Sequence, residues 1–313
     1  MGTSLSKRSF LTLKDFSRDE IRELLDLSHT VKRQRRDGEI HQRFLGRTLA
    51  MLFEKRSTRT RCAFDTAFGE EGGHAVFLSA EDIHLGVKES LEDTARVLGR
   101  MFDAIEFRGF KQKTAEVLAE YSGVPVYNGL TDDFHPTQAL ADLMTIEEHF
   151  GRLEGINVCF CGDGRNNVAR SLLIGCAKMG VNITIAAPSA LAPSKENIAS
   201  AETEAMTRRS AVRTLERLEF AVKDADVIYT DVWASMGEEA LLAEREPLLR
   251  PYQVNQALME RSGKPTTMFL HCLPAVRGRE VTAEVIDGSR SLVWEQAENR
   301  KHTIKALMLA TLS

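Results

Sequence analysis

The sequence has 313 residues, of which 43% are hydrophobic and 27% are charged, and its formal net charge is −4. This length is enough for two domains of ordinary size, and the composition is typical of a globular protein with a sizeable core. A chain with net negative charge has no overall attraction for nucleic acid, so no nucleic-acid partner is expected. No apolar run approaches the ~20 residues of a membrane span, so no membrane association is expected either.

The five cysteines are odd in number and lack the spacing of metal ligands. Cys159 and Cys161 lie two positions apart in an apolar run, so a strand would place both thiols on one face of a sheet. Residues 1–14 lack the apolar segment of a secretory signal. Together these features predict a cytoplasmic protein with buried, reduced thiols and no metal.

In the first half of the chain, segments with helical spacing of apolar residues alternate with short apolar segments. The first helix is expected over 15–36 and the first strand over 48–53. In chain order there follow a helix at 59–68, a strand at 72–79, a helix at 90–101, a strand at 104–108, a helix at 113–121, a strand at 124–128 and a helix at 136–149.

The second half repeats the alternation. We expect a strand at 156–161, a helix at 166–179, a strand at 181–187, mostly helix at 196–218, a strand at 227–230, a helix at 254–261, a strand at 267–271 and a last helix from about 297. Such alternation predicts an α/β fold with two domains, each a mostly parallel sheet flanked by helices. The glycine-bounded segment 151–155 is the natural hinge, so the domains are expected at 1–150 and 151–296, joined by interdomain helices.

A basic cluster follows the first expected strand, in the segment FEKRSTRTR at 53–61. Four cations and three hydroxyls lie between Lys55 and Arg61, where a helix is expected to begin. The first amides of a helix lack intrahelical partners and suit an anion, and hydroxyls and guanidinium groups add donors. A dianionic phosphate fits this set, with Arg59 and either Arg56 or Arg61 contributing charge. The alternatives are a solvated basic turn or a nucleic-acid patch, which usually includes aromatic residues.

A strand end and a helix start carry candidates for binding a carbonyl group. Arg108 ends an expected strand, and His135 precedes Pro136 at the start of an expected helix. The positive end of the helix dipole disfavours a second positive charge, so His135 is expected to be neutral and able to donate a hydrogen bond. Gln138 lies one turn further on. The alternatives are a capping role for His135 and a surface ion pair for Arg108.

The second half offers candidates for an amino-acid substrate. The segment 162–167 (GDGRNN) resembles a dinucleotide-binding loop, but its third glycine is absent and the next strand has no acidic residue for a ribose. Asp231 ends an expected strand and suits an α-ammonium group, although aspartate also caps turns. Cys272 ends another expected strand, where a cysteine is often only a small buried side chain.

Four motifs in this order resemble those of the carbamoyltransferase family: STRTR at 57–61, HPTQ at 135–138, DVWASMG at 231–237 and HCLP at 271–274. The last two resemble the ornithine branch of that family. The resemblance implies that domain 1–150 binds carbamoyl phosphate, that domain 151–296 binds ornithine, and that the helix at about 297–313 packs back onto the first domain. It also implies a homotrimer and chemistry that needs no cofactor and no metal.

The same resemblance assigns roles to individual residues. Carbamoyl phosphate is expected to contact Ser57, Thr58, Arg59, Thr60, His84, Arg108, His135, Gln138, Cys272, Leu273 and Arg300. Ornithine is expected to contact Asn167, Asp231, Ser235 and Met236. The catalytic residues are expected to be Arg108, His135, Asp231, Cys272 and Arg300. In the family, the loop that carries His84 reaches into the active site of a neighbouring subunit.

The implied reaction is attack of the δ-amine of L-ornithine on carbamoyl phosphate, which gives L-citrulline and phosphate. Carbamoyl transfer to aspartate or putrescine stays open, as do a nucleic-acid module and a phosphate-binding protein without turnover. The sequence also leaves open the final proton acceptor, the choice between arginine synthesis and breakdown, and assembly beyond a trimer.

Overall fold

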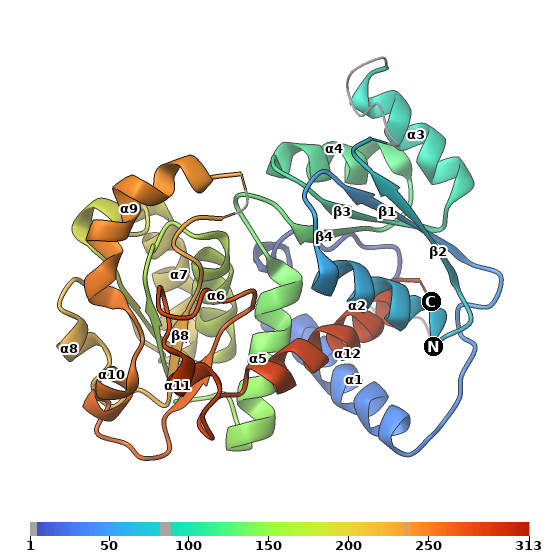
Figure 1. Cartoon of the computed structure of the whole chain (residues 1–313). Helices are drawn as coiled ribbons and strands as arrows, with labels where there is room; N and C mark the ends of the chain where they lie inside the picture. Colours follow the sequence, from blue (N-terminus) through green and yellow to red (C-terminus); the bar gives the residue numbers. More distant parts are fainter. Residues whose placement is uncertain (1–4, 82–88, 236, 313) are drawn as a thin grey trace. The chain divides into compact units, whose positions relative to one another are not determined.

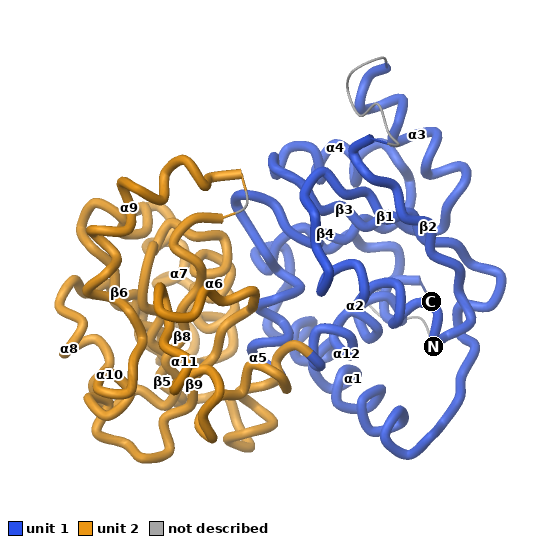
Figure 2. Tube along the Cα trace, in the orientation of Figure 1, with its two compact units in different colours: residues 1–144, 298–313 blue, residues 145–297 orange. Residues whose placement is uncertain are grey.

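The computed structural model of the chain describes residues 5–81, 89–235 and 237–312. It contains two compact units, one formed by residues 1–144 and 298–313 and the other by residues 145–297 (Figure 2). The chain leaves the first unit within helix α5 (Pro136–Phe150) and returns to it within helix α12 (Val293–Thr311). The boundaries of these units therefore fall inside helices, and the division of the chain at 150 and 296 stays a prediction.

The first unit contains a four-stranded parallel sheet in the order β2-β1-β3-β4 (Figure 1). Besides parts of α5 and α12 and a short 3₁₀ turn at Leu13–Asp15, its elements are α1 (Arg18–Arg36), β1 (Thr48–Phe53), α2 (Thr58–Gly69), β2 (His74–Ser79), α3 (Leu91–Met101), β3 (Ala104–Arg108), α4 (Gln112–Ser122) and β4 (Val126–Leu130). The parallel order requires each connection to cross a face of the sheet, and helices supply these crossings.

The two faces of this sheet differ in character. Ile105 and Phe107 of β3 pack with Leu98 of α3 and Leu118 of α4 in one apolar cluster. Because side chains alternate along a strand, Glu106 and the other even-numbered residues of β3 project to the opposite face. Helices α3 and α4 cover the first face, and α2 and α12 lie on the other (Figure 1). This second face carries the polar residues of the candidate site.

The second unit contains a five-stranded parallel sheet in the order β7-β6-β5-β8-β9. Its elements are β5 (Asn157–Cys161), α6 (Asn167–Met179), β6 (Asn182–Ala186), α7 (Lys195–Arg208), β7 (Val212–Leu215), α8 (Leu218–Ala221), β8 (Val227–Thr230), α9 (Leu242–Leu249), α10 (Gln256–Arg261), β9 (Met268–Leu270) and α11 (Ala283–Ile286), with 3₁₀ turns at Ser189–Leu191, Glu239–Leu241 and Arg250–Tyr252. The prediction of an α/β fold with two parallel sheets flanked by helices is confirmed.

Two details of the prediction are wrong. The helix expected within 196–218 ends at Arg208, and the strand β7 that follows was not predicted. Arg209 ends the helix in the left-handed conformation, at φ 56°, without the glycine that usually marks such an end. Within the described sheet β7 is the edge strand next to β6 and is largely exposed, so it lacks an apolar signature. The last helix begins at Val293 rather than near 297.

Candidate active site

The predicted residues of the first unit gather at the carboxyl ends of its strands. In the sheet register Phe53, the last residue of β1, pairs with Arg108, the last residue of β3, and Arg108 pairs with Leu130 at the end of β4. The three strands therefore end at the same edge of the sheet. Ligands of parallel α/β sheets bind beyond this edge. Arg108 lies at the edge, and the chain beyond it carries the segments 57–60 and 135–138.

The start of α2 has the form of an anion-binding helix terminus. Ser57 is the N-cap, and its hydroxyl oxygen accepts the backbone N–H of Thr60 at 3.1 Å. Thr58 is exposed, Arg59 is half-buried and Thr60 is buried. The guanidinium of Arg61 stacks 3.8 Å from the ring centre of Phe77, so it is engaged with β2. Of the two additional cations considered for the phosphate, Arg61 is thus committed to an aromatic contact.

Two buried arginines meet at the hydroxyl of Thr60. Arg108 Nη1 and Arg300 Nη2 each donate to Thr60 Oγ1 at 3.3 Å. Arg300 Nη1 also donates to Gln138 Oε1 at 2.6 Å and lies 3.4 Å from Nε2 of His135. All five side chains are at least nine-tenths buried. The fold thus brings together residues from α2, β3, α5 and α12 that are far apart in the sequence.

The electrostatics of this cluster favour a neutral imidazole. The pKa of His135 is held well below its ordinary value, first by burial and then by the positive charges of Arg300, Arg108 and Arg59. The sequence predicts the same neutral state from the helix dipole, but burial and the guanidinium groups are the larger causes. A neutral ring next to two arginines is able to donate to a carbonyl oxygen without adding charge.

Asp142 also belongs to this cluster and was not predicted from the sequence. The side-chain amide of Gln138 donates to Asp142 Oδ1 at 2.8 Å, and both residues are buried. This bond orients the amide so that its oxygen faces Arg300. The four-residue spacing on one helix is a recognised interaction distance and was the available signal.

In the second unit, Asp231 is the centre of the polar residues at the strand ends. It directly follows β8 and is 7% exposed. Its Oδ1 accepts the thiol of Cys272 at 3.1 Å and the backbone N–H of Val232 at 2.8 Å, and its Oδ2 accepts the amide of Asn166 at 2.9 Å. Asp231 is therefore fixed in place by groups from β8, from the residues after β9 and from the start of α6.

The two asparagines at the start of α6 have different roles. Asn166 is the N-cap, and its Oδ1 accepts the backbone N–H groups of Val168 at 2.7 Å and Ala169 at 3.4 Å. Asn167, the residue predicted to meet the substrate, is the first residue of the helix and is 6% exposed. The contact of Asn166 with Asp231 was missed, although an asparagine before an apolar helix is a standard capping signal.

The HCLP segment is held by a buried histidine. Nδ1 of His271 accepts the backbone N–H of Leu273 at 2.8 Å, and its Nε2 lies 3.4 Å from Glu280 Oε1. His271 and Glu280 are both fully buried. Leu273 has a φ of 58° and is followed by a cis peptide bond to Pro274. The histidine thus fixes the loop that presents Cys272 and Leu273, and no sequence signal pointed to Glu280.

Ser235 lies in the loop after β8, where its backbone N–H donates to Glu238 Oε2 at 3.3 Å. His84 and Met236 lie outside the described residues.

The described part of the chain contains one group of side chains with metal-ligand geometry. Ligand atoms of Asp231, His271 and Cys272 lie within 4.8 Å of one another. A cation there would displace the thiol proton that Cys272 donates to Asp231 and compete with the N–H of Leu273 for His271. The expected absence of a metal stays a prediction.

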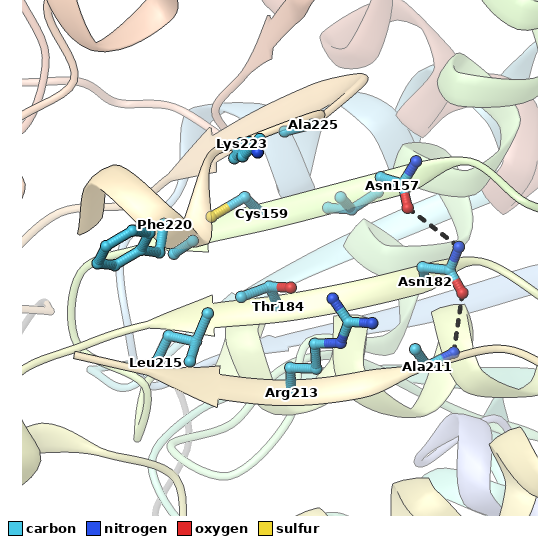
Figure 3. A pocket seen from close by; sticks show the side chains of 12 residues that line it. Asn157, Cys159, Asn182, Thr184, Ala211, Arg213, Leu215, Phe220, Lys223 and Ala225 are labelled. Atoms are coloured by element: carbon cyan, nitrogen blue, oxygen red, sulfur yellow. Dashed lines mark hydrogen bonds between the residues drawn. The ribbon is translucent and has the colours of Figure 1, made fainter. Parts of the chain in front are cut away.

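A cavity of about 130 Å³ lies in the second unit, against β5, β6 and β7 (Figure 3). Asn157 and Asn182, the first residues of β5 and β6, are joined by a 3.0 Å hydrogen bond, and Asn182 Oδ1 accepts the N–H of Ala211 at 2.8 Å. These polar groups satisfy one another at the amino ends of the strands. The cavity is therefore separate from the candidate site.

Among the described helices, none has the length and apolar character needed to cross a membrane.

Comparison with known proteins gives a consistent result along the whole chain. Residues 8–148 match the carbamoyl-phosphate-binding domain of aspartate/ornithine carbamoyltransferases, and residues 154–311 match their Asp/Orn-binding domain. The chain is 62% identical to an ornithine carbamoyltransferase of Caldanaerobacter subterraneus over 100% of both chains. It is 64% identical to one of Thermotoga maritima, again over 100% of both.

A solved ornithine carbamoyltransferase of Pyrococcus furiosus matches with a TM-score of 0.96 at 48% identity, covering 99% of this chain and 98% of that one. The two domain matches, which together span most of the chain, and the buried arginine cluster at the carboxyl ends of the first sheet lead to one conclusion: the chain belongs to the aspartate/ornithine carbamoyltransferase family.

Proposed function

We propose that this protein is an ornithine carbamoyltransferase, which transfers the carbamoyl group of carbamoyl phosphate to the δ-amine of L-ornithine. The observation that carries the proposal is the convergence of Arg108 and Arg300 on Thr60 at the start of α2. Two buried guanidinium groups, a helix terminus and a neutral histidine form a site for a substrate with a dianionic phosphate beside a carbonyl group.

In this proposal the phosphate binds at the start of α2, to the backbone amides and to Ser57, Thr58, Arg59 and Thr60. The carbonyl oxygen faces Arg108 and His135, and the carbamoyl amine faces Gln138. As the tetrahedral intermediate forms, the carbonyl oxygen gains negative charge, and Arg108 is already in place to stabilise it. One such preorganised donor is typically worth ~2.7–4 kcal/mol in kcat.

We assign Asp231 to the α-ammonium group of ornithine and Asn167 to its α-carboxylate. Ser235 and Met236 belong to the same proposal, and so do Cys272 and Leu273 beside the reacting groups. An alkyl ammonium has an ordinary pKa of ~10.4, so its deprotonation at neutral pH costs about 4.6 kcal/mol. Desolvation of the bound amine favours its neutral form. The leaving phosphate is the proposed final proton acceptor.

We further propose a homotrimer in the cytoplasm; whether His84 acts in the site of a neighbouring subunit stays open. The free cysteines Cys62, Cys159, Cys161, Cys176 and Cys272 support a reducing compartment. Sedimentation analysis of the purified protein tests the assembly, and a mass of one or two chains contradicts it.

A direct assay tests the function. Citrulline formation is measured from carbamoyl phosphate and ornithine, with aspartate and putrescine as competing acceptors. We expect turnover with ornithine alone. Turnover with aspartate instead would place the chain in the other branch of the family, and anion binding without any turnover would support a phosphate-binding protein.

A matched pair of variants tests the phosphate site. Arg59→Ala removes the half-buried cation at the start of α2, whereas Arg33→Ala removes an exposed arginine of α1 in the same unit. We expect Arg59→Ala to raise the KM for carbamoyl phosphate at least about 100-fold, which corresponds to about 2.7 kcal/mol for a charge-assisted contact. Arg33→Ala should leave KM unchanged. Equal behaviour of the two variants would refute the assignment.

A further inference from the structure

A buried carboxyl group lies on the sheet face that carries the arginine cluster. Glu106 is the middle residue of β3, two positions before Arg108, so both side chains project to the same face. Glu106 is fully buried. Among the described residues, neither of its carboxyl oxygens has a hydrogen-bond partner. Buried carboxylates are almost always paired, so this arrangement requires an explanation.

The position of the carboxyl group is fixed by close packing. In the sheet register Glu106 lies between Met51 of β1 and Tyr127 of β4. A methyl group added at Gly129 would lie 1.9 Å from Glu106 Oε1 and 3.0 Å from Cγ2 of Thr60. The absence of a side chain at Gly129 thus leaves the room that the carboxyl group fills, directly beside the threonine on which the two arginines converge.

Among the described residues, the charges that act on Glu106 come from two elements. Arg108 of β3 and Arg300 of α12 act on it through their positive charge. The neighbouring residue of β1 is Met51, which does not ionise, and the hydroxyl of Tyr127 is bonded to Thr311 at 2.7 Å. Burial raises the pKa of Glu106 well above its ordinary value, and the two arginines oppose this shift. The protonation state of Glu106 therefore depends on how much arginine charge is available to it.

We propose that Glu106 is a positioning residue of the anion site, and that its carboxyl group takes up a proton from solvent when carbamoyl phosphate binds. An ionised Glu106 competes with the substrate for the charge of Arg108 and Arg300, and a protonated one does not. A bound dianion adds negative charge beside the carboxyl group and favours its neutral form. By linkage, affinity for the anion falls as pH rises through the pKa of Glu106 in the empty site.

This inference rests on the proposed carbamoyl phosphate site, and its test keeps the two apart. The probe is phosphonoacetamide, an inert mimic that retains a phosphonate and an amide. Its dissociation constant is measured by calorimetry at several pH values for the parent protein and for Glu106→Gln, which mimics the neutral acid. The phosphonate of the probe titrates identically in both measurements, so its effect cancels when one dissociation constant is divided by the other. Glu116→Gln, an exposed site on α4, is the matched control.

We expect the dissociation constant of the parent, divided by that of Glu106→Gln, to rise with pH. The total rise should be about tenfold for each unit by which the bound anion raises the pKa of Glu106. The parent should also take up protons on binding when the titration is repeated in buffers of different ionisation enthalpy, and Glu106→Gln should take up fewer. If Glu106→Gln does not fold, Glu106→Met and the proton uptake of the parent alone still decide the question.

Three results are informative. A flat ratio with equal proton uptake overturns the inference, even if Glu106→Gln lowers the melting temperature, because that pattern marks a purely structural residue. A parent protein that forms no citrulline and binds no probe overturns the proposed function as well. A parent that forms citrulline with a flat ratio overturns only the role of Glu106.

Discussion

His302 of α12 links the stability of the first unit to pH. It is 1% exposed, and its Nε2 lies 3.2 Å from Oε1 of Glu298. Burial lowers its pKa from 6.5 to about 4, with Lys301 and Lys32 adding to the shift and Glu298 opposing it. His302 lies two positions after Arg300 on the same helix, so the helix that carries an arginine of the candidate site contains a group that resists protonation.

The sign and size of the effect follow from these values. Between about pH 4 and pH 6.5 the unfolded chain binds more protons at this position than the folded chain, so stability is fully present above 6.5 and is lost as pH falls toward 4. Each pH unit corresponds to about 1.4 kcal/mol, so the full loss is about 3 kcal/mol. From about pH 7.5 to about pH 5 the expected loss is about 2 kcal/mol.

The assay is urea denaturation of the parent and of His302→Gln at these two pH values, with His149→Gln, an exposed histidine of α5, as the control. The stability of His302→Gln should depend less steeply on pH than that of the parent, by about 2 kcal/mol. The His149→Gln curve should parallel that of the parent. Parallel curves for the parent and His302→Gln would refute the assigned cause.

Two other predictions concern the candidate site. Thr60→Val removes the hydroxyl oxygen that accepts from Arg108 and Arg300 but keeps the shape of the side chain. Loss of these hydrogen bonds costs about 1–3 kcal/mol and should lower kcat/KM roughly 5- to 150-fold in a steady-state assay. An unchanged kcat/KM would show that the hydroxyl is dispensable. Cys272→Ala removes the thiol that donates to Asp231 and should raise the KM for ornithine about fivefold. Cys272→Ser retains a donor, so its KM should rise less. An equal KM for both variants would contradict a hydrogen-bonding role.

Local features of the sequence were enough to predict most elements and the ends of strands. The strand at Thr48–Phe53 and the start of the helix that follows it were predictable from neighbouring residues, because a short apolar run and helix capping act over a few positions. The edge strand β7 was not predictable in this way. Its place in the sheet depends on pairing with β6. The helix α7 lies between the two strands in the chain and ends without a glycine, so no local signal marks where β7 begins.

For the candidate site, the sequence by itself determined the residue types at each strand end and their order along the chain. Only the tertiary structure decided which of them meet. Arg300 lies 240 positions after Thr60, and only the return of α12 to the first unit brings its guanidinium to that hydroxyl. The burial of Glu106 beside Gly129 was likewise set by parallel pairing of β3 with β4. Contacts of this kind depend on chain closure over long distances, which no local spacing of residues encodes.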